Sequence, residues 1–297
     1  MKKFKMIMMR FVQGFFMAAA DSVPGVSGGT IAFLLGFYDE FINALDDLFK
    51  GKLSEKKKAL LFLIKIGIGW VAGFVICALL LVKLFDKKIY GLSSLFLGFI
   101  IFAIPLVIIE EKEVLKGKYK NIIFSILGMA LVVGISLLNT KSGLVDVGNI
   151  THLTIPLAIY IFLTGAIAIT AMVLPGISGS TLLLIFGLYM PIMTCVKKVL
   201  SFNFNYLLPL LIFMCGLVVG IVTFVRLIKK SLVKYRSQTI YTIIGMMLGS
   251  LYAIVQGPTT LKVPQPAMTF STFSIVWFII GALIIFGLQV FKKVMEK

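Results

Sequence analysis

The sequence predicts an all-α polytopic membrane protein with an inverted-topology repeat. Each half is expected to be a helical hairpin, re-entrant in our interpretation, followed by three transmembrane helices. The membrane class follows from composition: the 297 residues are 60% hydrophobic and 14% charged, and the mean hydropathy is +1.06. Soluble domains carry roughly 25% charged residues, so this composition excludes a soluble globular protein.

The repeat is visible in a short motif that occurs twice. Residues 24–30 read PGVSGGT and residues 175–181 read PGISGST. A glycine and a tyrosine follow each copy at the same spacing: Gly36 and Tyr38, then Gly187 and Tyr189. Weaker similarity continues downstream, aligning 69–73 with 216–220 and Gly98 with Gly245. The duplicated unit is therefore a hairpin together with the spans that follow it.

Apolar runs divide the chain into the two units. We expect the first repeat to cover residues 1–145, with a hairpin at 10–45 and spans at about 59–82, 89–109 and 121–138. We expect the second to cover residues 146–297, with a hairpin at 153–196 and spans at about 207–228, 238–255 and 273–291. A helix needs roughly 20 residues to cross a bilayer, and most of these runs reach that length.

The first hairpin arm, from Arg10 to Asp21, is too short to cross, which predicts a re-entrant hairpin with residues 24–30 at its tip. Residues 153–174 are long enough to span, so re-entry of the second hairpin rests on the repeat alone. A hairpin returns to its starting side, whereas three spans cross to the other side. The second unit must therefore begin on the opposite face from the first.

Loop charges predict the orientation. With both termini placed in the cytoplasm, the cytoplasmic segments hold 21 Lys and Arg residues and the external segments hold 7. The positive-inside rule therefore favours cytoplasmic N- and C-termini. Because the basic residues lie in short loops rather than on a soluble face, we expect them to meet membrane lipids and not nucleic acid.

The two motif copies predict an anion site. Proline near a helix start, followed by serine and glycine, leaves backbone N–H groups unpaired and lets a ligand approach the backbone. Two opposed tips would converge on one anionic group near the bilayer midplane. The alternative is that Gly and Ser only allow tight helix packing. The candidate anion-binding residues are Gly25, Ser27, Gly28, Gly29, Thr30, Gly176, Ser178, Gly179, Ser180 and Thr181.

Two ionisable residues accompany the tips. Asp21 lies three residues before Pro24, and it either carries a coupling proton or caps the helix start. Lys65 lies six residues into its span, and it either approaches the anion or extends its ammonium group to the cytoplasmic edge. No metal-ligand cluster or nucleotide-binding loop is found in the sequence, so apart from proton or ion coupling we expect no cofactor.

An intramembrane serine hydrolase is the enzyme alternative, because residues 25–29 match the pattern G-x-S-x-G. A nucleophilic serine needs a general base, and the only histidine, His152, is predicted to lie in an external loop. The second copy also lacks the final glycine of the pattern. These points favour a transporter, and a carrier of a small soluble anion remains a second alternative.

Residues 20–30 and 174–181, each with its following glycine and tyrosine, resemble the paired signatures of the bacterial polyprenyl-phosphate transporter family, formerly a membrane domain of unknown function. The resemblance covers essentially the whole chain in length and segment order. It implies transport of undecaprenyl phosphate, the lipid carrier of cell-wall precursors, from the outer to the inner leaflet. The second copy departs from the first by Met172 in place of Asp21 and Ser180 in place of Gly29, so a role for Asp21 is confined to one hairpin.

Overall fold

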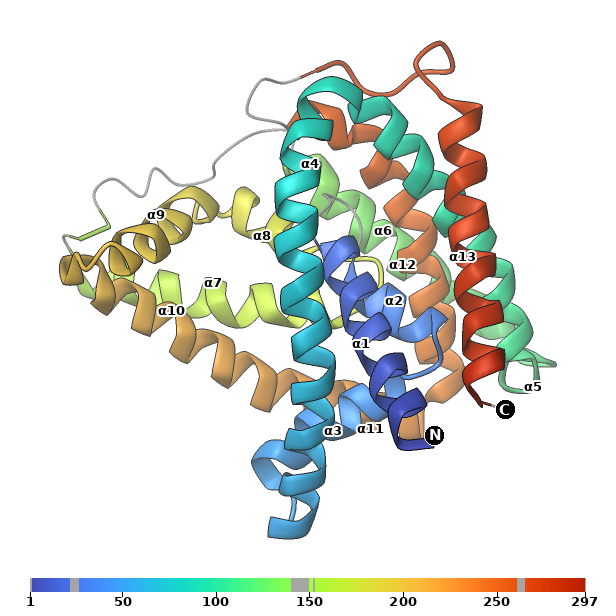
Figure 1. Ribbon diagram of the computed structural model, residues 1–297, viewed down its shortest axis with the longest axis horizontal. Helices are drawn as coiled ribbons and strands as arrows, with labels where there is room; N and C mark the ends of the chain where they lie inside the picture. The colour runs from blue at the N-terminus through green and yellow to red at the C-terminus, as the bar shows by residue number, and fades with distance from the viewer. Residues whose placement is uncertain (1, 22–26, 140–149, 152, 261–264, 297) are drawn as a thin grey trace.

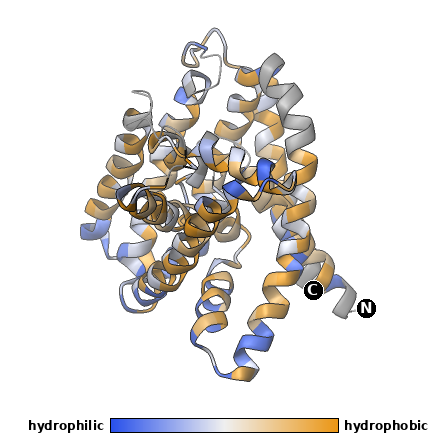
Figure 2. Ribbon diagram, turned by 90° about the vertical axis from the view of Figure 1, so that its left-hand side faces the viewer, coloured by the Kyte–Doolittle hydropathy of each residue, from blue (hydrophilic) through white to orange (hydrophobic). Residues whose placement is uncertain are grey.

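The computed structural model describes the whole chain except residues 1, 22–26, 140–149, 152, 261–264 and 297. Gly25, His152 and the predicted boundary between the two repeats lie outside the described residues. Every regular element in the described part of the chain is a helix, as the composition predicted. Hydrophobic residues run along the long helices, and hydrophilic residues gather at helix ends and loops (Figure 2).

The first half contains a broken hairpin followed by long helices. Its elements are α1 (Lys2–Asp21), α2 (Gly28–Leu34), α3 (Tyr38–Lys50), α4 (Leu53–Glu110), α5 (Lys112–Leu115), η1 (Tyr119–Asn121) and α6 (Ile122–Asn139). Helix α4 is continuous across both predicted spans, with a kink at Lys88, where φ is −143° and ψ is 38°. Helix α1 begins before the apolar run, since lysine and arginine are good helix formers and extend it into the basic N-terminus.

The second half likewise begins with a long helix, a seven-residue helix and a third helix. Its elements are α7 (Ile155–Val173), α8 (Gly179–Ile185), α9 (Tyr189–Leu200), η2 (Phe204–Tyr206), α10 (Leu207–Gly220), the π-helical turn η3 (Ile221–Val225), α11 (Arg226–Lys234), α12 (Arg236–Gln256), η4 (Gly257–Thr260) and α13 (Ile275–Glu296). Both chain termini lie on one side of the bundle, together with α5 and α11 (Figure 1). We call this the terminal side.

Seven helical segments among the described residues are long and apolar enough to cross a membrane. They are Leu53–Cys77, Lys88–Glu110, Tyr119–Leu137, Ile155–Val173, Phe204–Lys234, Arg236–Thr259 and Ile275–Val294. Six of them match the six predicted spans, and the seventh is α7, the first arm of the second hairpin. Helix α1 is not among them, because the lysines and Arg10 in its first half interrupt the apolar run.

The glycine that follows each motif copy ends a short helix. Helices α2 and α8 each have seven residues. Just beyond them, Gly36 has φ of +70° and Gly187 has φ of +66°, a left-handed conformation that glycine adopts without steric cost. The chain then turns sharply into α3 or α9, each of which begins with the tyrosine of the motif. The repeated glycine and tyrosine thus mark a repeated helix break.

Each hairpin arm packs closely on a span of its own half. Helix α1 lies against α4 and α7 lies against α10, with glycines where backbones meet. A Cβ atom on these glycines would collide with a carbonyl oxygen of the partner helix. The pairs are Gly14 with Ile66 and Gly69 with Phe11, then Gly165 with Phe213 and Gly216 with Phe162.

The remaining spans pair between the two halves. The second part of α4 packs on α13, and α12 packs on α6. Here too a glycine on each helix meets a carbonyl of the other. The pairs are Gly98 with Phe278 and Gly281 with Leu95, then Gly245 with Ser125 and Gly128 with Thr242. Gly98 and Gly245 are aligned residues of the sequence repeat, so aligned glycines make the same kind of contact.

Candidate functional site

The two motif copies contact each other in the interior of the bundle. The Ser27 hydroxyl donates to the carbonyl oxygen of Leu174 at 3.0 Å. In the opposite direction, the backbone N–H of Gly176 donates to the Thr30 hydroxyl at 2.9 Å. Both Ser27 and Thr30 are fully buried. We call this contact between residues 27–30 and 172–179 the tip crossing.

Local sequence explains why the first tip can make this contact. Ser27 has extended backbone geometry, and its hydroxyl accepts the N–H of Gly29 at 3.1 Å, which caps the start of α2. The same hydroxyl keeps its proton free to donate across the crossing. A Cβ atom on Gly29 would lie 2.5 Å from the carbonyl oxygen of Val173, so only glycine lets the two backbones approach this closely.

Glycine is also required on the second tip. Gly176 has φ of +86°, and a Cβ atom there would lie 2.7 Å from the backbone of Met246 on α12. Ser178 is buried, and Gly179, Ser180 and Thr181 form the first turn of α8. The tip of the second hairpin is therefore held between the first hairpin and α12.

Asp21 is the last residue of α1, and its carboxylate lies at the start of α2. Its carboxylate accepts the backbone N–H of Gly28 at 2.7 Å and the indole N–H of Trp70 at 3.1 Å. An anionic group thus already sits on a backbone donor of the first tip. Trp70 was not among the residues predicted for the site. The one signal in the sequence was its indole N–H, a donor that needs a partner within an apolar span.

Lys65 lies on α4, outside the residues that form the tip crossing. Within the described part of the chain, no hydrogen bond or ion pair is found for its ammonium group. It lies on α4 five residues before Trp70, about 7.5 Å along the helix axis at 1.5 Å per residue. Among the described residues, the partners of the Asp21 carboxylate are Gly28 and Trp70 and not Lys65.

Ion pairs join α3 to neighbouring helices on the terminal side. Arg236 of α12 bridges Asp39 and Glu111, with the Asp39 contact at 2.8 Å. Lys229 of α11 contacts Asp46 at 2.8 Å. Arg10 of α1 contacts Glu40 at 2.6 Å. The first hairpin is thereby tied electrostatically to helices of the second half.

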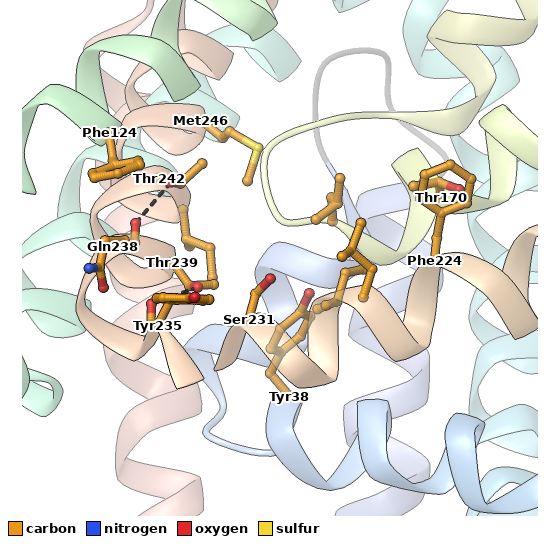
Figure 3. Close-up of a pocket in the computed structure, with 14 residues that line it drawn as sticks. Tyr38, Phe124, Thr170, Phe224, Ser231, Tyr235, Gln238, Thr239, Thr242 and Met246 are labelled. Carbon is orange, nitrogen blue, oxygen red and sulfur yellow. Dashed lines mark hydrogen bonds between the residues drawn. The ribbon is translucent and has the colours of Figure 1, made fainter. Parts of the chain in front are cut away.

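A cavity of about 650 Å³ lies between the tip crossing and these ion pairs. Its lining is contributed by α3, α6, α7, η3, α11 and α12 (Figure 3). Leu174, which accepts the Ser27 hydrogen bond, and Met246, which packs on Gly176, line the cavity next to the crossing. Sequence reasoning missed this cavity, because its walls come from segments far apart in the chain.

These features define a multi-pass helical membrane protein with a buried polar contact between two interrupted helices. Residues 17–272 match the model of the undecaprenyl phosphate translocase-like family, and the chain belongs to this family. This confirms the predicted polyprenyl-phosphate transporter family. The family is one of translocases and not of enzymes, which also confirms the prediction that the chain is not an enzyme.

Two relatives are similar over most of their length. A polyprenyl-phosphate transporter of Vibrio cholerae is 33% identical over 262 residues, covering 85% of this chain and 79% of the relative. A polyprenyl-phosphate transporter of Staphylococcus aureus is 34% identical over 285 residues, covering 96% of both chains. No solved structure matches the chain.

Proposed function

We propose that this protein carries undecaprenyl phosphate from the outer to the inner leaflet of the bacterial plasma membrane and so returns the lipid carrier for reuse. Family membership supports a polyprenyl-phosphate substrate. The observation that carries the proposal is the tip crossing, where hydroxyl and backbone donors from both hairpins meet in the interior of an apolar bundle.

In this proposal the phosphate binds by replacing the bonds between the two tips. The N–H of Gly176 and the hydroxyls of Ser27 and Thr30 then point at phosphate oxygens, together with backbone donors at residues 28–29 and 178–181. A hydrogen bond between neutral groups contributes about 1 kcal/mol net, and one to a charged group contributes roughly 1.5–3 kcal/mol. The exchange is therefore favourable once the lipid phosphate reaches the crossing.

The inverted repeat supplies the movement that this exchange requires. Support comes from aligned glycines: Gly98 and Gly245 each meet a carbonyl oxygen of the partner helix in a pair that joins the two halves. Two similar, opposed units rock about a shared site and expose it to each leaflet in turn. In this account the hairpins are re-entrant, and the terminal side, where both termini lie (Figure 1), is the cytoplasmic side.

Asp21 competes with the phosphate for the first tip. Its carboxylate accepts the Gly28 N–H that an incoming phosphate would use. Protonation removes its charge and weakens its hold on this donor, which is then free to bind the substrate. Proton binding and lipid binding are thereby linked. We assign Lys65 no contact with the phosphate.

The experiment that tests this function is leaflet exchange in vesicles containing the purified wild-type protein. Labelled undecaprenyl phosphate, the unphosphorylated undecaprenol and soluble inorganic phosphate are offered in separate samples. We expect exchange of the lipid phosphate above that of protein-free vesicles, with no uptake of inorganic phosphate. Uptake of inorganic phosphate without lipid exchange would replace the proposal with a carrier of a small soluble anion.

A further inference from the structure

The cavity between the tip crossing and the ion pairs is lined by a residue whose buried hydroxyl group has no hydrogen-bond partner among the described residues. Tyr38 is only 2% exposed, and its hydroxyl has no hydrogen-bond partner among the described residues. Burying such a group without a hydrogen bond is energetically unfavourable. Figure 3 shows the side chains of Tyr38 and Ser231 directed toward the middle of the cavity. An unsatisfied donor in this position indicates a ligand that accepts a hydrogen bond.

The other residues that line the cavity indicate the chemical character of the rest of that ligand. They are mostly apolar, with Phe224, Leu227 and Ile228 from the second half of the bundle. Polar groups are few, and those of Thr239 and Thr242 already donate to backbone carbonyls of their own helix. The ligand therefore has a largely apolar body and a small polar group near Tyr38.

The open end of the cavity faces the basic terminal side. Leu227 and Tyr235 line the cavity and are exposed, so the space is not sealed. The Lys234 ammonium group lies 5.5 Å from the centre of the Tyr235 ring, which puts a cation at this rim. An anionic head group that moves between the crossing and the membrane surface meets Tyr38 first and the basic rim afterwards.

We propose that this cavity is a second binding site for the lipid substrate, in which the Tyr38 hydroxyl donates to the phosphate and the apolar walls hold the first isoprene units. Pockets of roughly 300–1,000 Å³ enclose drug-sized ligands, so the cavity takes the phosphate end while the rest of a long polyprenyl chain stays in the bilayer. The lipid occupies this site after it leaves the tip crossing and before it enters the leaflet on the terminal side.

This inference rests on the proposed function, because the occupant is the same lipid. It also assigns a role to Tyr38, the tyrosine that follows the first motif copy and takes no part in the tip crossing. Tyr38 is the first residue of α3 and lines the same cavity as Leu174 and Met246, which lie next to the crossing. A phosphate leaving the crossing thus passes directly to the Tyr38 hydroxyl.

Binding of farnesyl phosphate to the purified full chain in detergent, measured by titration calorimetry, tests the site. Tyr38→Phe removes an oxygen atom that has no partner, so the variant keeps its fold. We expect its affinity for farnesyl phosphate to fall about tenfold, the equivalent of one charge-assisted hydrogen bond of about 1.4 kcal/mol. The matched control is Tyr160→Phe, whose hydroxyl donates to Phe186 away from the cavity, and we expect its affinity to be unchanged.

A second pair of variants tests the apolar walls. Thr242→Trp fills the cavity and is expected to weaken binding of both farnesyl phosphate and farnesol, whereas Tyr38→Phe weakens only the former. The control is Thr223→Trp, at an exposed threonine outside the cavity lining that makes the same kind of bond to its own helix backbone. Inorganic phosphate at the same concentrations is expected to give no heat and to leave farnesyl phosphate binding unchanged.

The outcomes separate this inference from the proposed function. If the wild type binds farnesyl phosphate and exchanges undecaprenyl phosphate in vesicles, but Tyr38→Phe and Thr242→Trp bind as the wild type does, the cavity is not a lipid site. If inorganic phosphate competes as well as farnesyl phosphate, the isoprene part of the inference is wrong. If the wild type exchanges no lipid in vesicles, the transport function itself fails.

Discussion

The two hairpins have the same backbone plan but differ in the side chain that lies against the first residue of the short helix. In the first, Asp21 lies against Gly28 and accepts its N–H at 2.7 Å. In the second, Met172 lies against Gly179 at the aligned position, with its sulfur 3.1 Å from where a Cβ atom would be. A thioether fills this space as well as a carboxylate does. Packing at this position therefore does not by itself require a charge, and in our proposal the carboxylate of Asp21 acts in transport.

A second difference lies on the helices that follow the tips. Helix α3 carries Asp39, Glu40 and Asp46, each in an ion pair with another helix. The aligned positions on α9 are Met190, Pro191 and Lys197. The first hairpin is thus anchored by its carboxylates on the terminal side, while α9 has no carboxylate at any of these positions. In our account the two hairpins are not equally free to move.

The largest effect is expected from placing the serine of the second tip at the aligned position of the first. Gly29→Ser introduces the residue found at the aligned position 180, yet its Cβ atom would lie 2.5 Å from the Val173 carbonyl. Relieving such an overlap costs roughly 1–3 kcal/mol and moves the tips apart. We expect a lower free energy of unfolding and loss of lipid exchange. Gly67→Ser, at a glycine with open space around it, is the control, and equal behaviour of the two variants would contradict the tip crossing.

The next largest effect concerns Asp21. Asp21→Met copies the second tip and removes the carboxylate that holds the Gly28 N–H. Because this donor is then open to the phosphate at every pH, we expect a folded protein with at least about tenfold faster lipid exchange at neutral pH, the equivalent of about 1.4 kcal/mol. Exchange at the wild-type rate would show that the carboxylate serves only as a helix cap. Thermal unfolding of the two proteins checks that the packing of the first tip is retained.

The pH dependence of exchange separates coupling from capping. In the wild type we expect exchange to accelerate as the pH falls, because protonated Asp21 releases the Gly28 N–H. The lipid phosphate itself titrates with a second pKa of about 6, and this contribution remains in Asp21→Asn. The difference between the two pH profiles therefore isolates Asp21, and identical profiles would exclude proton coupling through it.

A smaller effect is expected from Arg236→Gln, which removes the bridge between Asp39 and Glu111. Partly exposed ion pairs contribute about 0.2–1 kcal/mol each, so we expect a loss of about 1 kcal/mol in stability, less at high salt. Denaturant unfolding at two ionic strengths measures it. A stability difference that does not change with salt would mean that the bridge acts through packing and not through charge.

The smallest effect is expected at Lys65, whose ammonium group has no hydrogen bond or ion pair among the described residues. Lys65→Gln should change stability by less than about 0.5 kcal/mol, as for most surface substitutions. Vesicle exchange should proceed at the wild-type rate. A strong loss of exchange would indicate that Lys65 contacts the phosphate.

The features that could be predicted from the sequence are those that depend on local pattern. Composition indicated the membrane class, and the repeated motif directed attention to Ser27 and Thr30 before their contacts were known. The partners of these residues could not be predicted, because Leu174 and Gly176 are brought to them by packing of helices far apart in the chain. The unpaired hydroxyl of Tyr38 could not be predicted from the sequence either, because burial is a property of the folded molecule.

The most direct test of the central claim is exchange of labelled undecaprenyl phosphate between leaflets in vesicles containing the Ser27→Ala/Ser178→Ala protein. Its matched control is Ser136→Ala/Ser250→Ala, which removes two buried hydroxyls that donate to carbonyls of their own helices. We predict that the first variant folds but exchanges lipid at least about tenfold more slowly, the equivalent of about 1.4 kcal/mol, while the control matches the wild type. Equal exchange by both double variants would contradict phosphate binding at the tip crossing.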